Sequence, residues 1–441
     1  MRQRFSIMLS HKIKADNTKP NVIIILTDQQ RHDAVGYLND KVITPNLNAL
    51  AKNSIVCTNA FVQSPQCQPS RASILTGRYP TAHKVWWNET YLSKSEKTIG
   101  NIFKDAGYNT GYFGKFHVEN DMSYPLLAKH FGWDHVYLLE DWQRQVAVDT
   151  FEVNSAQIRK EFYGPMSNKT WTGSINHKRL HHEEVITDRA VEYIKNAEDP
   201  FMIIVSYHGP HPPYAAPDEF TSLYQRSEMS VPSIKKPNLN NHQMTDDEWR
   251  ELKIQYFGAI SWIDDNIGRI LQVAGDSIIV FMSDHGDMLG DHGEFSKGIY
   301  AYDGNTRIPL LIKLPRVSSR QYTHFVQGID ILPTMLQACN LSAHPGIQGH
   351  SLVDAFIHNN SVNNEVVSML CHSNRLRMIR TDAYKYWIYG STEYLFDLNE
   401  DPEELNNVAY TNVALLQEAR FRLLRKLIEC EDPLPIPRPI H

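Results

Sequence analysis

Two acidic residues, Asp28 and Asp284, each follow a run of strongly apolar residues. Two carboxylates that fold close together repel each other unless a cation or a proton lies between them. Gln29 adds an amide oxygen beside the first carboxylate, and His285 adds an imidazole beside the second. Such an oxygen-rich set suits Ca²⁺, Mg²⁺ or Mn²⁺ better than a metal that prefers thiolates. Alone, each aspartate could simply cap a helix or begin a turn, but together these residues favour a metal site.

A third candidate is Cys67, which stands just before Pro69 where a helix is predicted to begin, because proline is well tolerated in a first turn. The free N–H groups at such a position attract anions. A cysteine placed there could be a thiolate of low pKa, a structural thiol, or the precursor of another group. A thiolate is a poor partner for a hard, oxygen-preferring cation. An oxygen nucleophile would therefore match the predicted metal better.

Apart from Cys67, the candidate residues stand where predicted strands end, and they include Lys115, His117, His208 and His211. The strands are expected at 22–26, 110–114, 201–206 and 277–282. In open α/β sheets, ligands bind beyond the carboxyl ends of the strands. Polar residues follow most strands simply because loops are polar, and for one strand that explanation would suffice. Four ends rich in Asp, His and Lys favour one shared site.

Helical patterns alternate with these strands, which predicts an α/β fold with a large, mainly parallel mixed sheet flanked by helices. The helices are expected at 45–52, 99–106, 183–196 and 249–273. After about residue 349 the pattern changes to short strand-like runs at 377–380 and 384–389, followed by a helix at 414–429. We therefore predict an N-terminal extension (1–19), a catalytic domain (20–348) and a smaller C-terminal α+β subdomain (349–441) with a short antiparallel sheet. The proline-rich tail at 433–439 is expected to be extended.

The composition limits the classes of function. The 441 residues are 42% hydrophobic and 21% charged, which is typical of a soluble globular protein. The net charge of -6 argues against a nucleic-acid-binding protein. The five cysteines show no CxxC spacing, so neither a zinc ribbon nor a disulfide scaffold is indicated. We find no apolar run typical of a membrane span or a secretory leader, and we expect a cytoplasmic protein, or a periplasmic or secreted one if a leader has been removed. The sequence does not indicate an oligomeric state.

The run from Cys67 to Arg78, CQPSRASILTGR, resembles the signature of the type I sulfatases of the alkaline phosphatase superfamily. That signature is Cys-x-Pro-Ser-Arg, a short spacer, and Leu-Thr-Gly-Arg. Similar stretches recur from about residue 19 to about residue 408, at 114–117, 208–213, 283–290, 296–297, 378–386, 395–398 and 401–403. The resemblance implies an alkaline-phosphatase-like fold.

The resemblance also implies a mechanism. A maturation enzyme would oxidise Cys67 to formylglycine (3-oxoalanine), an aldehyde whose hydrate carries two hydroxyls. One hydroxyl, held by the metal and Arg71, would attack sulfur while His211 or Lys297 protonates the departing alcohol, which leaves a sulfated enzyme. The second hydroxyl would then lose its proton to His117 and expel sulfate. Covalent catalysis of this kind splits one difficult displacement into two easier steps.

Several other residues take roles by the same resemblance. Lys115 would join Lys297, Arg71 and the metal in countering negative charge on the transferring group. Residues 115 and 117 are expected to project to the same face of an extended strand. Asn88 resembles a position that contacts the sulfate, and His208 is expected to face the substrate.

The metal is expected to be one divalent ion ligated by Asp28, Gln29, Cys67 in its modified form, Asp284 and His285. Gln29 replaces the second aspartate that many sulfatases carry, and His285 replaces a frequent asparagine. Ca²⁺ is the first choice, and Mn²⁺ or Mg²⁺ remain open because a neutral glutamine lowers the negative charge of the site.

The expected reaction is hydrolysis of a sulfate monoester, with a carbohydrate sulfate as the first choice and choline or aryl sulfates open. A phosphonate monoester or phosphodiester hydrolase would share the same motifs. An inactive protein that binds sulfated glycans through an unmodified Cys67 is a further alternative. Five aromatic residues could line a subsite for the leaving group, although packing in the core is expected for most of them: Trp86, Trp87, Tyr91, Trp133 and Tyr214.

Overall fold

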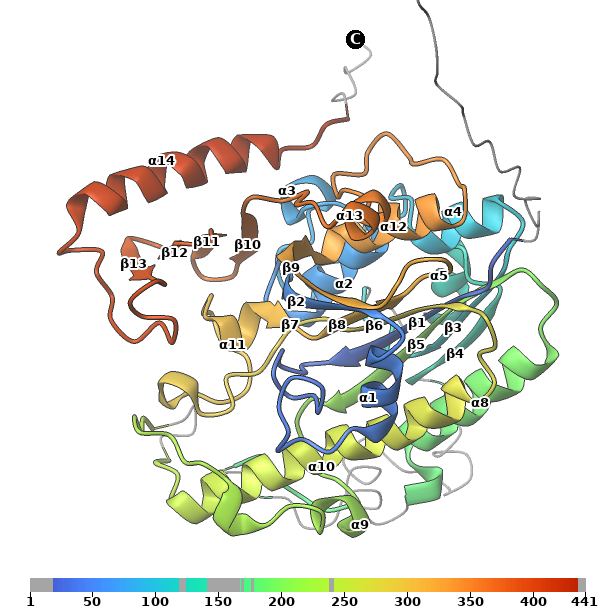
Figure 1. Ribbon diagram of the computed structural model, residues 1–441, viewed down its shortest axis with the longest axis horizontal. Helices are drawn as coiled ribbons and strands as arrows, with labels where there is room; N and C mark the ends of the chain where they lie inside the picture. Colours follow the sequence, from blue (N-terminus) through green and yellow to red (C-terminus); the bar gives the residue numbers. More distant parts are fainter. Residues whose placement is uncertain are drawn as a thin grey trace, which may run out of the picture.

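The computed structural model describes residues 19–118, 124–139, 141, 167, 170–175, 178–237 and 242–434 (Figure 1). The predicted N-terminal extension and most of the proline-rich tail lie outside these residues. Within them, no helix is both long and apolar enough to cross a membrane.

A large mixed sheet forms the centre of the protein, with strand order β4-β3-β5-β1-β6-β8-β2-β7 and with β9 paired to β2. Strand β1 runs parallel to both β5 and β6, and β3 runs parallel to β4 and β5. The predicted parallel α/β sheet is thus confirmed. Its strands are β1 (Val22–Asp28), β2 (Ile55–Phe61), β3 (Asn109–Gly114), β4 (His135–Leu138), β5 (Phe201–Pro210), β6 (Ile278–Ser283), β7 (Arg307–Ile308), β8 (Leu310–Lys313) and β9 (Arg320–Gln327).

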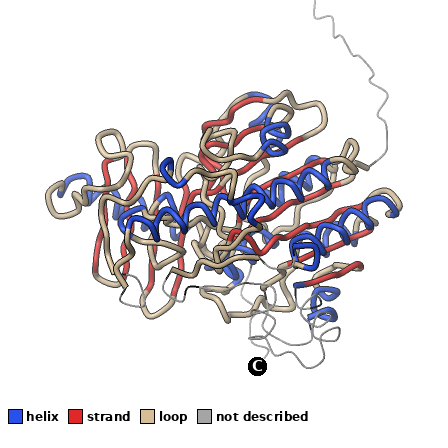
Figure 2. The backbone as a smooth tube through the Cα atoms, turned by 90° about the horizontal axis from the view of Figure 1, so that it is seen from below, coloured by secondary structure: helices blue, strands red, loops and turns tan. Residues whose placement is uncertain are grey.

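Helices cover both faces of this sheet, so β1 is buried on both sides (Figures 1 and 2). Val22, Ile24 and Leu26 belong to one core cluster and Ile23 and Ile25 to another. On the first side lie α2 (Cys67–Thr76), α4 (Ile99–Asp105), α5 (Tyr124–His130), α12 (Ile331–Ala338) and α13 (Val353–His358). On the second side lie α1 (Pro45–Ala51), α8 (His182–Asn196) and α10 (Asp246–Leu271). Two-sided burial explains the unbroken apolar run.

Capping sets the start of the longest of these helices. The helix was predicted to begin at Trp249, but α10 begins at Asp246. The Thr245 side chain accepts a hydrogen bond from the Glu248 backbone N–H, and the Glu248 side chain accepts one from the Thr245 backbone N–H. This reciprocal capping box satisfies N–H groups that would otherwise lack partners. The described part of the large domain also contains the short α-helices α3 (Pro80–His83), α9 (Asp218–Thr221) and α11 (Asp303–Thr306).

A second, four-stranded antiparallel sheet follows, which matches the small C-terminal sheet that was predicted. Its strands are β10 (Val366–Cys371), β11 (Arg375–Arg380), β12 (Tyr384–Tyr389) and β13 (Thr392–Asp397), and α14 (Val413–Glu429) closes the chain. One face packs on α14, and the other packs against Ala301 of the large domain. The preceding α13, although beyond residue 349, packs in the core of the large domain. The sheet lies beyond one end of the large sheet (Figure 1).

Candidate active site

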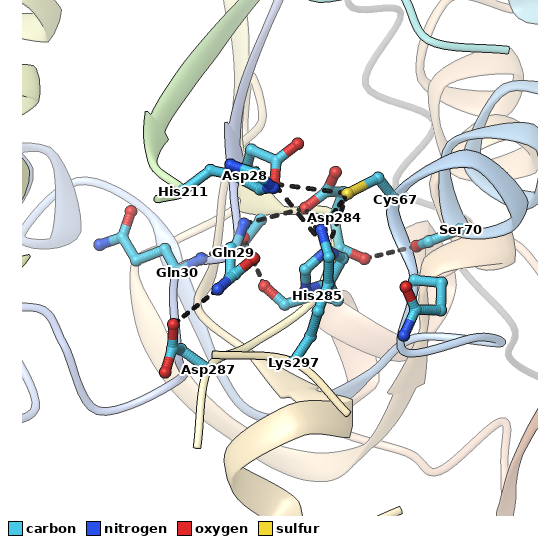
Figure 3. Close-up of polar contacts among 12 residues, drawn as sticks. Asp28, Gln29, Gln30, Cys67, Ser70, His211, Asp284, His285, Asp287 and Lys297 are labelled. Carbon is cyan, nitrogen blue, oxygen red and sulfur yellow. Dashed lines mark hydrogen bonds and ion pairs between the residues drawn. The ribbon is translucent and has the colours of Figure 1, made fainter. Parts of the chain in front are cut away.

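Asp28 ends β1, and Asp284 and His285 directly follow the neighbouring strand β6. Cys67, the first residue of α2, meets them there (Figure 3). One potential ligand atom from each of these four residues lies within 4.8 Å of the others, and all four residues are buried. The structure therefore brings together the predicted nucleophile precursor and the predicted His and Asp ligands of the metal.

The thiol of Cys67 has polar neighbours on several sides. Its Sγ lies 2.6 Å from Lys297 Nζ, 3.2 Å from His285 Nε2 and 3.5 Å from Asp28 Oδ1. Burial alone would raise the pKa of this thiol, but the charges of Lys115, Lys297 and His285 hold it well below its usual value. Such an environment stabilises negative charge on the atom attached to the Cys67 Cβ.

The two aspartates experience opposite shifts. Burial would raise the pKa of Asp28, but Lys115, with Nζ 2.5 Å from Oδ2, and the more distant His211 and Lys297 hold it well below its usual value. Burial and the neighbouring Asp28 raise the pKa of Asp284. The positive side chains of the site thus favour the ionised form of Asp28. Ionisation of Asp284 costs free energy, and a bound cation would remove that cost.

The orientation of His285 fits a metal ligand. Its Nδ1 lies 2.9 Å from the Gly286 carbonyl oxygen, which can only accept, so Nδ1 carries the proton and the lone pair of Nε2 faces the cluster. Nε2 lies 3.7 Å from Asp284 Oδ1 and 3.8 Å from Asp28 Oδ1. Spacings of this order are expected between ligands that each lie about 2.4 Å from one ion.

Gln29 also fits the ligand set. Its side chain is fully buried, and its Oε1 has no hydrogen-bond partner among the described residues. Its Nε2 donates to Asp287 Oδ2 at 2.7 Å and to Ser296 Oγ at 3.0 Å, so the amide is held in one orientation. A buried carbonyl oxygen without a donor is costly, and a cation would satisfy it.

Arg71 lies beneath the carboxylates. It is 1% exposed and donates from Nε to Asp284 Oδ2 at 2.8 Å and from a terminal nitrogen to Asp28 Oδ2 at 3.2 Å. Its other terminal nitrogen donates to the Lys115 carbonyl and to Ser206 Oγ. Arg71 thus fixes the two carboxylates, and its predicted contact with the attacking hydroxyl stays a prediction.

Lys115 and His117 both reach Cys67, but not from an extended strand as predicted. Strand β3 ends at Gly114, and His117 has a φ of 48°, so the chain turns sharply before it. Lys115 Nζ lies 3.9 Å from Cys67 Sγ. Burial lowers the pKa of His117, partly offset by its hydrogen bond with Cys67. The prediction of one shared strand face was wrong, while the proximity of both residues to Cys67 is confirmed.

His211 follows β5 and lies beside Asp28 (Figure 3). Its Nδ1 donates to the Pro212 carbonyl at 2.7 Å, which leaves Nε2 as the nitrogen that exchanges protons. Burial and the charge of Lys297 hold the pKa of His211 well below its usual value. His208 packs against it with ring centroids 4.8 Å apart.

The side chain of Asn88 lies beside the first turn of α2. Its Oδ1 accepts from the Gln68 backbone N–H at 3.1 Å, next to the nucleophile position. The expected contact between Asn88 and sulfate stays a prediction.

Sequence reasoning missed the residues that orient this set. Asp287 accepts from Gln29 and from the Tyr214 hydroxyl at 2.7 Å, and Ser206 accepts from Arg71. Asp287 is fully buried and stands three residues after Asp284, a spacing that could have identified it. Tyr214 and Ser206 carry no comparable sequence pattern.

Comparison with known proteins identifies the family of this chain. The sulfatase profile matches residues 20–341, most of the chain. The chain belongs to the sulfatase family. A second profile, that of the C-terminal region of N-sulphoglucosamine sulphohydrolase, matches residues 290–432 of this sulfatase. The family is one of sulfuric ester hydrolases, so the inactive alternative is not supported.

Individual proteins agree with this assignment. An ulvan-active sulfatase from Formosa agariphila is 30% identical over 94% of this chain and 82% of its own. A phosphonate monoester hydrolase from Agrobacterium radiobacter shares the fold, with a TM-score of 0.81 and 22% identity over 94% of this chain and 96% of that one. A protein solved with its substrate D-glucosamine-2-N,6-O-disulfate has a TM-score of 0.77 and 18% identity over 93% of this chain and 98% of that one.

Proposed function

We propose that this sulfatase hydrolyses a carbohydrate sulfate monoester, using formylglycine made from Cys67 and one divalent cation. The observation that carries the proposal is the setting of Cys67 Sγ, which has Lys297, His285 and Asp28 within 3.5 Å. A thiol needs no such set of partners. A carbon bearing two hydroxyls can both donate to and accept from these groups, and each hydroxyl would have a partner.

The cation would be held by Asp28, Gln29, Asp284 and His285, a set dominated by oxygen that favours Ca²⁺, with Mg²⁺ and Mn²⁺ as alternatives. It would supply a fixed positive charge beside the reacting oxygen atoms. The orphaned Gln29 Oε1 and the raised pKa of Asp284 support this assignment. Arg71 keeps the two carboxylates in register for the ion.

The remaining residues of the site divide the proton transfers and the charge. Lys115 and Lys297 both lie within 3.9 Å of Cys67 Sγ and counter negative charge on the sulfate oxygens. His117 accepts the proton of the second hydroxyl in the step that expels sulfate, because its lowered pKa keeps it neutral. Burial and Lys297 lower the pKa of His211, and the negative charge of the bound sulfate would raise it again, so that His211 donates a proton to the leaving alcohol.

Two relatives favour a saccharide as the leaving group. The Formosa protein is named for activity on ulvan, and the protein with a TM-score of 0.77 was solved with a sulfated glucosamine. The substrates of these two proteins are not evidence of the substrate of this chain, but together they make carbohydrate sulfates the first class of substrate to test.

Phosphonate monoester hydrolysis is the second candidate, because the Agrobacterium hydrolase has the same fold. The two activities are separated by comparing kcat/KM for an aryl sulfate with kcat/KM for an aryl phosphonate monoester. The protein should be co-produced with a formylglycine-generating enzyme. We expect the sulfate ester to be the better substrate, and a preference for the phosphonate would overturn the assignment.

A further inference from the structure

The C-terminal sheet reaches the loops that carry the active site. The Met369 backbone N–H of β10 donates to the Gln63 carbonyl at 2.8 Å, four residues ahead of Cys67. At the end of the same strand, the Cys371 N–H donates to the Trp86 carbonyl at 3.2 Å. The turn that follows β10 is therefore fixed beside the segment that leads to Asn88.

At this turn an aromatic pair joins the two domains. The ring of His372 lies on that of Trp87, with centroids 4.3 Å apart. His372 is exposed and Trp87 is only partly buried, so the pair borders solvent. Trp87 directly precedes Asn88, which bonds to the backbone next to Cys67. The pair consequently stands at the edge of the reaction centre.

A second aromatic segment leaves the site from Lys297. The Gly298 carbonyl accepts from Gln66 Nε2 at 3.3 Å, which holds this segment beside α2 and leads to the partly buried Tyr300. Tyr389 and Tyr394, also partly buried, pack with Trp87 on the face of the C-terminal sheet that meets the large domain. Tyr394 stacks on Trp387 at 3.7 Å, which fixes the plane of its ring.

We propose that the aromatic band formed by Trp87, Tyr300, His372, Tyr389 and Tyr394 binds sugar rings linked to the sulfated residue, so that the substrate is an oligosaccharide or polysaccharide. This inference rests on the function proposed above and specifies its substrate class. Rigid aromatic rings can pack against the C–H face of a pyranose, and tyrosine and histidine also offer hydrogen bonds to sugar hydroxyls.

The extent of the band favours more than one sugar ring. From His372, which directly follows β10, to Tyr394 on β13 it spans three inter-strand spacings, or about 14 Å. It is also continuous with both Asn88 and Lys297, so a chain lying on it leads toward the nucleophile. A purely aliphatic ligand could not form hydrogen bonds with the tyrosine hydroxyls or with the His372 imidazole of the band.

Steady-state kinetics with three esters test the proposal. The probes are a sulfated tetrasaccharide, the sulfated monosaccharide that carries the same ester, and methyl sulfate, which has no ring. The variants are His372→Ala, which alters only an exposed side chain, and Tyr394→Ala. Tyr410→Ala is the matched control, because Tyr410 is 70% exposed and precedes α14, on the other side of the C-terminal sheet.

We expect KM for the tetrasaccharide to rise roughly three- to tenfold in both variants, with a smaller change for the monosaccharide and none in the control. Three results would overturn the band as a sugar site. They are an equal loss of activity on all three esters, no loss of activity on any of them, and turnover of methyl sulfate without turnover of any saccharide. Those results would leave the sulfatase reaction standing. Absence of turnover of every sulfate ester by the matured protein would instead contradict the proposed function.

Discussion

Two clusters of buried charge among the described residues differ in how far the chain's own cations occupy the space between the carboxylates. In the C-terminal subdomain, the fully buried Lys385 contacts Asp303 and lies 2.5 Å from Glu404 Oε1. There the chain places its own ammonium group between two carboxylates. At the active site, Arg71 donates to the Oδ2 atoms of Asp28 and Asp284, but the Oδ1 atom of each faces the Nε2 of His285, at 3.8 Å and 3.7 Å.

This difference shows how a structural cluster of ion pairs can be distinguished from a cation-binding active site. Burial and shifted pKa values occur in both, since burial also raises the pKa of Glu404, to about 7. What distinguishes the active site is the convergence of potential ligand atoms from Asp28, Cys67, Asp284 and His285, which all lie within 4.8 Å of one another. Convergent acceptors identify a cation site, whereas buried charge alone does not.

The largest effect should come from the nucleophile position. Cys67→Ala removes the precursor and should lower kcat for an aryl sulfate by at least about 10⁴-fold, because no other group replaces the attacking oxygen. The variant should still bind the metal, which calorimetry checks. A Cys67→Ala protein with near-normal turnover would refute the mechanism.

The matching change in the structural cluster is Lys385→Met. It leaves Asp303 and Glu404 buried without their cation and should lower the free energy of unfolding by about 3–5 kcal/mol, measured in urea. The folded fraction should keep its kcat. Adding Glu404→Gln should recover part of the stability. If Lys385→Met abolished turnover in protein that remains folded, the division between the two clusters would be wrong.

A smaller effect is expected at Gln29. Gln29→Leu removes the carbonyl oxygen and should weaken metal binding by at least about tenfold, the scale seen for changes around metal ligands. The control is Gln30→Leu, because Gln30 is equally buried but donates to the Ala34 carbonyl and points away from the cluster (Figure 3). Equal affinities in the two variants would remove Gln29 from the ligand set.

A change of conditions rather than of sequence should also weaken metal binding, because the affinity depends on pH. Burial lowers the pKa of His285, but Asp284 and Cys67 outweigh it, so the net pKa is raised above 6.5. A metal must displace the proton from Nε2, so affinity should fall as the pH drops through this raised pKa. The loss should be up to tenfold per pH unit for each proton displaced. Calorimetric titration from pH 8 to pH 5 checks this, and a flat profile would exclude His285 as a ligand.

The sequence predicted the centre of the site better than its surroundings. Asp28 and Asp284 could be placed because strand ends in a parallel sheet share one edge, and Cys67 because its motif is specific. The turn at His117 and the four hydrogen bonds of Arg71 depend on packing between distant segments, which periodicity does not encode. The contact between Trp87 and His372 joins residues from two domains and had no local pattern.

The central claim is that turnover requires the aldehyde made from Cys67. The most direct test is to prepare the protein with graded amounts of a formylglycine-generating enzyme and to measure by mass spectrometry the fraction of Cys67 peptide that carries the aldehyde. Initial rates of sulfate release, per mole of protein, are then plotted against that fraction. The account predicts a straight line through the origin. Undiminished turnover in protein whose Cys67 is entirely thiol would contradict it.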